Sequence, residues 1–266
     1  MAPPYALDVL RQRLTERRHD DEVLSPLDPR ALLGGTWWQG GSWPDALSAG
    51  VLEACHGYRF RPENLALAGL IRGIGARRVV DLGAGTGSLT LIVAAMCEPE
   101  RIVAVERQAG VAERLARTID AHALASVQLQ VGDVRSPVVL DAVLADAGGA
   151  ADLIVTNPPF FEAGWGRESR NAETHLSTHA VHGDVQDFLS AAARLLADEG
   201  RVFVVFDAQR MHLVMAAAGQ VGLGLEELRW IPDRQTGAPF RCWMMFGWRG
   251  ATVGCLGGGG DAGGGR

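Results

Sequence analysis

Lysine is absent from this chain of 266 residues: all 25 basic side chains are arginines. With 31 aspartates and glutamates, the formal net charge is −6, which does not indicate a protein that binds nucleic acid through its overall charge. Genome base composition alone can produce a lysine-free chain. The arginine fork suits phosphates and stacked bases, so a local basic face stays compatible with the acidic total.

Cysteine is scarce, and long apolar runs are missing. The four cysteines form no C-x-x-C pair, which indicates reduced thiols and neither a disulfide framework nor a zinc site: Cys55, Cys97, Cys242 and Cys255. No apolar run approaches the length of a membrane span, and the arginine-rich start, Met1 to Asp20, lacks the apolar stretch of a signal peptide. We therefore expect a cytoplasmic protein.

From Arg77 onward, short apolar runs alternate with helical stretches. Strands are expected at Val79-Val80, 102–105, 127–131, 153–155 and 202–206. Helices are expected at 108–123 and at 185–198, the second with Gly200 as its stop. This alternation predicts an α/β fold with a mainly parallel sheet and helices on both faces. Two further strands, 225–231 and 240–248, predict a terminal antiparallel hairpin and bring the total to seven.

The chain divides into three parts by composition. Residues 1–50 combine a short amphipathic helix at 5–19 with an arm rich in glycine and tryptophan, residues 51–250 form the main domain, and residues 251–266 are a glycine-rich tail expected to be disordered. For the arm, packing of its tryptophans on the core is favoured over a stacking surface for a nucleic acid: Trp37, Trp38 and Trp43.

The most informative motif is Asn157-Pro158-Pro159-Phe160, directly after a predicted buried strand. Open α/β sheets bind ligands at the carboxyl ends of their strands, which is where this amide falls. Prolines lack N–H groups and leave their carbonyls free to accept, and the aromatic ring offers a flat face. The motif therefore predicts a site for a planar group that bears an exocyclic NH2.

A glycine loop, Asp81-Leu82-Gly83-Ala84-Gly85-Thr86-Gly87, follows the first strand and precedes a helix from Ser88 to Cys97. Glycines allow sharp turns and close backbone approach to a ligand, although a G-x-G pattern alone is weak. Three carboxylates at successive strand ends sharpen the prediction. Asp81 suits a cationic sulfonium or ammonium, Glu106 is placed to hold a ribose diol, and Asp133 could accept from an adenine amino group. This set predicts an S-adenosylmethionine pocket in preference to a dinucleotide pocket.

With these motifs the chain resembles the class I amino-methyltransferases that carry [Asp/Asn]-Pro-Pro-[Tyr/Phe/Trp]. Residues 51–250 look most like the bacterial tRNA adenine-N6 methyltransferases, on the glycine loop, on Asn157-Pro158-Pro159-Phe160-Phe161, on Gly57-Tyr58-Arg59-Phe60 and on the helix with Asn64-Leu65-Ala66-Leu67-Ala68. The chain departs from that family at Phe160, where tyrosine is common, and at His179-Ala180, where an acid commonly follows the histidine. The resemblance implies a Rossmann-like class I methyltransferase fold.

The resemblance also implies a reaction, the transfer of a sulfonium methyl to an exocyclic nitrogen, most of all adenine N6 in a tRNA. Asn157 and the carbonyl of Pro158 would accept the amino hydrogens, with Pro159 shaping the turn and Phe160 stacking on the base. Alternatives are a release-factor glutamine methyltransferase and an rRNA guanine-N2 methyltransferase. From other classes, an inactive nucleotide-binding module and a nicotinamide oxidoreductase are disfavoured by the loop spacing together with the asparagine motif.

Several further residues have both a functional and a structural interpretation. Tyr58, Arg59 and Phe60 either lie against the methionine end of the cofactor, as the resemblance implies, or only pack. Phe161, Arg167 and Arg170 follow the catalytic motif and could meet the substrate, the two arginines through phosphate, although solvated loop charges explain them too. A polar helix face or loop explains His175, His179 and His182 better than a metal site does, so no metal is expected.

Overall fold

A mixed sheet of nine strands forms the core of the protein in a computed structural model, which describes residues 24–26, 36–38, 62–71, 73–159, 184–232 and 239–249. The strands follow the order β1-β2-β8-β9-β7-β6-β3-β4-β5. Their bounds are β1 Leu24–Pro26, β2 Thr36–Trp38, β3 Arg78–Leu82, β4 Arg101–Glu106, β5 Val127–Val131, β6 Ala151–Thr156, β7 Leu196–Asp207, β8 Leu223–Pro232 and β9 Pro239–Trp248.

The central strands β5, β4, β3, β6 and β7 are parallel, and β9 lies antiparallel between β7 and β8. This confirms the expected seven-stranded sheet with its terminal antiparallel hairpin. β3 and β4 are covered on both faces, since residues 79–82 and residues 102–105 are all buried, and both strands are therefore mostly apolar.

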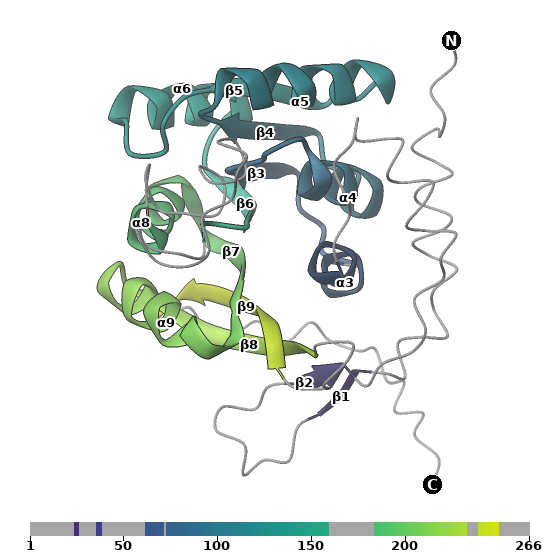
Figure 1. Cartoon of the computed structure of the whole chain (residues 1–266). Helices are drawn as coiled ribbons and strands as arrows, with labels where there is room; N and C mark the ends of the chain where they lie inside the picture. The colour runs from purple at the N-terminus through teal and green to yellow at the C-terminus, as the bar shows by residue number, and fades with distance from the viewer. Residues whose placement is uncertain are drawn as a thin grey trace, which may run out of the picture.

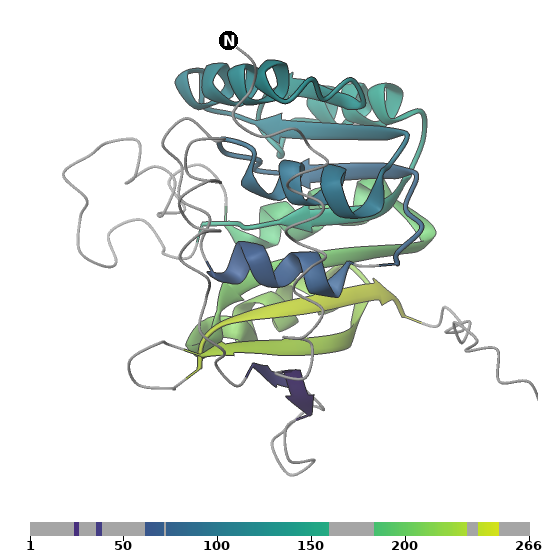
Figure 2. The same cartoon turned by 90° about the vertical axis from the view of Figure 1, so that its right-hand side faces the viewer.

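Helices cover both faces of the sheet (Figures 1 and 2). On one side lie α3, α4 and α5, and on the other α6, α8 and α9, with α5 and α6 nearest the β4–β5 edge of the sheet. The helices are α3 Pro62–Leu70, α4 Ser88–Cys97, α5 Ala109–Ala121, α6 Pro137–Ala147, α8 Val185–Leu195 and α9 Met211–Gln220, with a short 3-10 turn, η3, at Ala208–Arg210. Two large apolar cores result, one on each face of the sheet.

Local signals fix the ends of several helices. Ser136 caps α6 by accepting from the backbone N–H of Val139, with Pro137 as the first helical residue. Asp184 and Asp187 form a reciprocal capping box at the start of α8. The predicted stop of α8 at Gly200 is wrong: the helix ends at Leu195, and Gly200 lies inside β7, where a Cβ would come within 2.7 Å of the Ala151 carbonyl oxygen.

Two short strands from the N-terminal arm extend the sheet, which the sequence did not predict. β2 pairs in parallel with β8 through Thr36 and Trp37, and β1 pairs antiparallel with β2. The predicted helix at 5–19, Trp43 and the glycine-rich tail lie outside the described residues, so the proposed three-part division stays a prediction.

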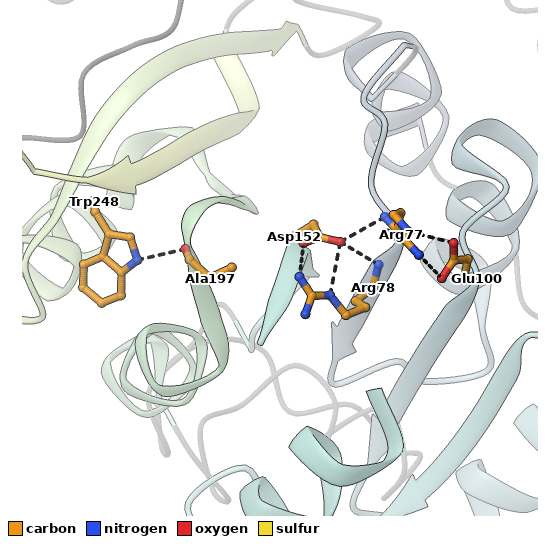
Figure 3. Close-up of polar contacts among 6 residues, drawn as sticks. All are labelled: Arg77, Arg78, Glu100, Asp152, Ala197 and Trp248. Atoms are coloured by element: carbon orange, nitrogen blue, oxygen red, sulfur yellow. Dashed lines mark hydrogen bonds and ion pairs between the residues drawn. The ribbon is translucent and has the colours of Figure 1, made fainter. Parts of the chain in front are cut away.

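The amino-terminal edge of the parallel strands is held by Asp152 at the start of β6 (Figure 3). Its carboxylate accepts from the backbone N–H groups of Arg77 and Arg78, at 3.0 and 2.9 Å, and from the Arg78 guanidinium at 2.7 Å. Arg77 in turn pairs with Glu100, just before β4. These contacts join β3, β4 and β6 at the edge opposite the candidate site.

Candidate active site

The glycine loop and the asparagine motif lie on neighbouring strands at the same edge of the sheet. β3 pairs with β6 in parallel register, so that Leu82, the last residue of β3, is opposite Thr156, the last of β6. The Thr156 hydroxyl donates to the Leu82 carbonyl at 2.8 Å and fastens the two strand ends together. The glycine loop, which starts at Gly83, and Asn157 therefore emerge side by side.

Three glycines of the loop adopt left-handed backbone conformations, with φ of 73° at Gly83, 59° at Gly85 and 99° at Gly87. The Gly83 and Ala84 N–H groups both donate to the Val105 carbonyl at 2.9 Å, which folds the loop over the end of β4. A Cβ at Gly87 would meet the Leu115 side chain at 2.6 Å, whereas a Cβ at Gly85 would meet no atom of the described residues within 4 Å. The loop is thus packed from below and open above Gly85, as a ligand cradle requires.

Glu106, at the end of β4, organises this loop. One of its carboxylate oxygens accepts from the Gly85 N–H at 3.0 Å and the other from the Gln108 N–H at 2.8 Å. The residue is only 7% exposed. Each carboxylate oxygen can accept a second hydrogen bond, so the predicted grip on a ribose diol is compatible with this arrangement and stays a prediction.

Asp81 is fully buried beneath the loop. Its Oδ2 accepts from the Thr90 hydroxyl at 2.6 Å, and its Oδ1 has no hydrogen-bond partner among the described residues. Burial raises the pKa of this carboxyl to about 7, against the opposing hydrogen bonds from Thr90 and with a smaller contribution from the charge of Glu106. A buried acid poised in this way favours a cationic group close by, since a cation stabilises its charged form.

Asn157 follows β6 with its side-chain Oδ1 buried and without a hydrogen-bond partner in the described part of the chain. Leaving a buried acceptor unpaired costs about 1–3 kcal/mol, so such groups are rare unless a ligand satisfies them. Pro158 and Pro159 follow and carry no N–H group that could compete for the same acceptor. The amide therefore lies ready to accept from a ligand, next to the glycine loop.

Asn64 on α3 is a buried polar residue next to the glycine loop whose contacts the sequence did not reveal. It is fully buried, and its Nδ2 donates to the Ser88 hydroxyl at 2.7 Å, at the first residue of α4, while its Oδ1 has no partner among the described residues. The Thr86 hydroxyl in the loop is likewise buried and unpaired. Four oxygens without a partner among the described residues thus lie in or beside the loop, on Asn64, Asp81, Thr86 and Asn157, and those of Asn64 and Asp81 are on fully buried side chains.

The carboxylate of Asp133, just after β5, is paired with two arginines. Its carboxylate forms a two-pronged contact with Arg135, at 3.0 and 2.7 Å, accepts from the Arg135 N–H at 2.9 Å, and pairs with Arg107 at 3.2 Å. The hydrogen bond and charge of Arg135 lower the pKa of this carboxyl. Acceptance from an adenine amino group stays a prediction, and it requires one of these arginine contacts to yield.

The remaining predicted site residues lie outside the described residues: Tyr58, Arg59, Phe60, Phe160, Phe161, Arg167, Arg170 and the three histidines. Among the residues that are described, no group of histidine, cysteine, aspartate and glutamate is arranged to hold a metal ion. No helix in the described ranges is long and apolar enough to cross a membrane.

Comparison with known families decides the class of the protein. The family model for the methyltransferase small domain matches residues 65–218, which run from α3 to α9. The chain belongs to this family. It thus contains a methyltransferase domain, and S-adenosyl-L-methionine is the cofactor that the family uses, in keeping with the glycine loop and the buried acid beneath it.

Several proteins with assigned activities are similar in sequence to part of this chain. A tRNA1(Val) (adenine(37)-N6)-methyltransferase of Aeromonas hydrophila is 37% identical over 131 residues, which are 49% of this chain and 51% of that protein. One of the same name from Cronobacter sakazakii is 29% identical over 64% of this chain and 67% of its own length. A release factor glutamine methyltransferase of Mycolicibacterium smegmatis is 33% identical over 48% of this chain and 45% of its own. The match thus spans about half the length of the first and third of these relatives.

Solved structures agree on the fold. NSun6 from Pyrococcus horikoshii superposes with a TM-score of 0.55 over 79% of this chain and 56% of its own, at 16% identity. At that identity the likeness shows the class I methyltransferase fold alone, which confirms the fold predicted from the sequence.

Proposed function

We propose that this methyltransferase transfers the methyl group of S-adenosyl-L-methionine to an exocyclic nitrogen, and that its substrate is an adenine N6 in a tRNA. The observation that carries the proposal is the buried Oδ1 of Asn157 beside the glycine loop, which has no hydrogen-bond partner among the described residues. Two of the three relatives described above carry a tRNA adenine-N6 methyltransferase name.

The cofactor supplies a methyl group already activated by a sulfonium charge, so the protein needs to position the acceptor more than to deprotonate it. Asn157 Oδ1 and the Pro158 carbonyl would accept the two amino hydrogens of the base and aim the nitrogen lone pair at the methyl carbon. Well-oriented reactants gain on the order of 7–11 kcal/mol over free collision. The cofactor would be held next to Asn157 by the residues of the glycine loop and the neighbouring strand end: Asp81, Gly83, Ala84, Gly85, Gly87 and Glu106.

The substrate is tested by mass spectrometry of nucleosides from tRNA incubated with the purified protein and S-adenosyl-L-methionine. We expect N6-methyladenosine to appear with wild-type protein and to vanish with Asn157→Ala, with a loss of at least about 10³-fold in kcat because the acceptor is no longer aimed. Cofactor affinity, measured by calorimetry, should stay within about twofold of wild type. Turnover of Asn157→Ala near the wild-type rate contradicts the role of the amide.

Methylation of a release-factor glutamine is the second candidate, because a side-chain amide also presents an NH2 group and one relative carries that name. The same protein preparation should be offered a purified release factor. A methylated glutamine together with unmodified tRNA would transfer the assignment to this candidate while leaving the role of Asn157 in place.

A further inference from the structure

An exposed phenylalanine stands at the same edge of the sheet as Asn157. Phe240 is 43% exposed and is the one aromatic residue among three large apolar residues exposed in the described ranges, the others being Val131 and Val138. Single exposed apolar residues are common and need no explanation by themselves. What distinguishes Phe240 is how it is held.

The ring of Phe240 is braced by a buried ion pair. The Arg241 guanidinium lies over the ring, 4.0 Å from its centre, and one of its nitrogens donates to Asp207 at 2.6 Å and to the Phe240 carbonyl at 3.1 Å. The Arg241 side chain is 7% exposed, and Asp207 also accepts from the Gln209 N–H. A rigid cation behind one face fixes the ring and leaves its remaining surface to solvent.

The sheet register places Phe240 at the same edge of the sheet as Asn157, two strands away and further out along the strand direction. Thr156 of β6 is opposite Val204 of β7, and β7 continues for three more residues to Asp207, which is opposite Arg241 of β9. At about 3.3 Å per residue and 4.8 Å per strand, Phe240 stands roughly 10 Å beyond Asn157 along the strands and roughly 10 Å to its side. This separation suits a nucleotide near the target nucleotide, and not the target itself.

We propose that Phe240, braced by Arg241 and Asp207, stacks on an unpaired base of the RNA substrate that flanks the methylated nucleotide. The inference rests on the proposed function, since it takes RNA as the substrate. Stacking needs a fixed aromatic face at the surface, which Phe240 offers, and every base carries a π face that it can meet. The neutralised Arg241–Asp207 pair contributes rigidity to this platform and no phosphate contact.

The test compares Phe240→Leu, which keeps the apolar bulk, with Phe240→Trp, which keeps a stacking face, and with Val138→Ala as a control at an exposed apolar residue elsewhere. RNA affinity is measured by filter binding of a tRNA transcript and of a short single-stranded oligonucleotide, and KM and kcat for tRNA are measured in parallel. Phe240→Leu should weaken RNA binding and raise KM roughly 5- to 150-fold, the range of aromatic–base stacking. Phe240→Trp and Val138→Ala should match wild type, and kcat and cofactor affinity should not change.

The outcomes separate this inference from the proposed function. If wild type methylates tRNA and Phe240→Leu binds RNA as wild type does, the stacking role is overturned and the function stands. If wild type methylates no tRNA but Phe240→Leu still weakens oligonucleotide binding against Phe240→Trp, the stacking role stands and the proposed reaction falls. If wild type binds no RNA, or Phe240→Leu raises KM only for a release factor, the inference is overturned.

Discussion

Burial of Asp81 makes the stability of this protein depend on pH in an unusual direction. The pKa of this carboxyl is about 7 in the folded protein against 3.8 for the ordinary group, with burial as the main cause. Between those values the native state holds a proton that the unfolded state has lost, so stability falls as the pH rises through this window and is level above it. A shift of about three units corresponds to roughly 4 kcal/mol of unfolding free energy.

Asp81→Asn should abolish this loss, because the amide has the same shape and no charge to bury. Below pH 7 the neutral native Asp81 and the amide of the variant both accept a neutral hydrogen bond from Thr90, and the stronger bond to the ionised form is already contained in the pKa of about 7. We therefore expect the cofactor-free variant to match wild type near pH 3 and to exceed it by roughly 4 kcal/mol at pH 8, measured by urea unfolding. Parallel pH profiles of the two proteins would refute the argument, because they would mean that Asp81 does not titrate in the folded state.

Asp81→Asn should also weaken the binding of the cofactor, so that its effects on stability and on function have opposite signs. If Asp81 stabilises a cationic part of S-adenosyl-L-methionine, its removal raises the Kd about 10- to 100-fold at pH 8. Wild-type affinity should then rise between pH 6 and pH 8 as the carboxyl ionises, and the affinity of the variant should not. Asp133→Asn is the matched control for the pH dependence of stability. Its pKa is lowered in the folded protein, so the stability that it contributes is lost on acidification and not on alkalinisation.

Three further substitutions test the loop and the opposite edge of the sheet. Gly87→Ala should lower the free energy of unfolding by about 2 kcal/mol, because φ is 99° and the new Cβ would lie 2.6 Å from Leu115. Thermal unfolding measures this loss, and an unchanged midpoint would contradict the close contact between Gly87 and Leu115. Gly85→Ala should cost only about 1 kcal/mol, since no described residue lies within 4 Å of its Cβ, yet should weaken cofactor binding, measured by calorimetry, at least tenfold. Unchanged affinity would place the cofactor elsewhere. Asp152→Ala should destabilise the fold by about 1–3 kcal/mol through its lost contacts to Arg77 and Arg78, without changing cofactor affinity.

The parallel core could be predicted from the sequence because its signals are local. The helix predicted from Ser88 to Cys97 has those bounds as α4, and the five central strands and the hairpin are where apolar runs placed them. The predicted helix end at Gly200 was wrong, because glycine commonly follows the last turn of a helix. In this protein the chain passes directly from α8 into β7, and Gly200 packs against the backbone of β6. A close approach between distant segments leaves no mark in a local pattern.

In the candidate site, too, the residues marked by local sequence signals could be predicted, and the contacts between distant residues could not. The positions of Gly83 to Gly87, Glu106 and Asn157 follow from strand ends that the sequence already marks. The contact of Asn64 with Ser88 joins residues 24 apart, and the saturation of Asp133 depends on Arg107 and Arg135 both turning toward it. Side-chain partners of this kind depend on the folded arrangement, so only the structure could reveal them.

The unpaired oxygens around the glycine loop connect stability with binding. Asn64, Asp81, Thr86 and Asn157 each leave a buried acceptor without a partner among the described residues, at about 1–3 kcal/mol apiece. The two apolar cores, which reach the loop through Leu82 and Leu89, contribute the stability that offsets this deficit. Ligands that supply donors at the loop remove part of this deficit, and they stabilise the native state in proportion to their affinity. S-adenosyl-L-methionine, with its amino groups and cationic sulfur, should therefore raise the unfolding midpoint more than NAD at the same concentration.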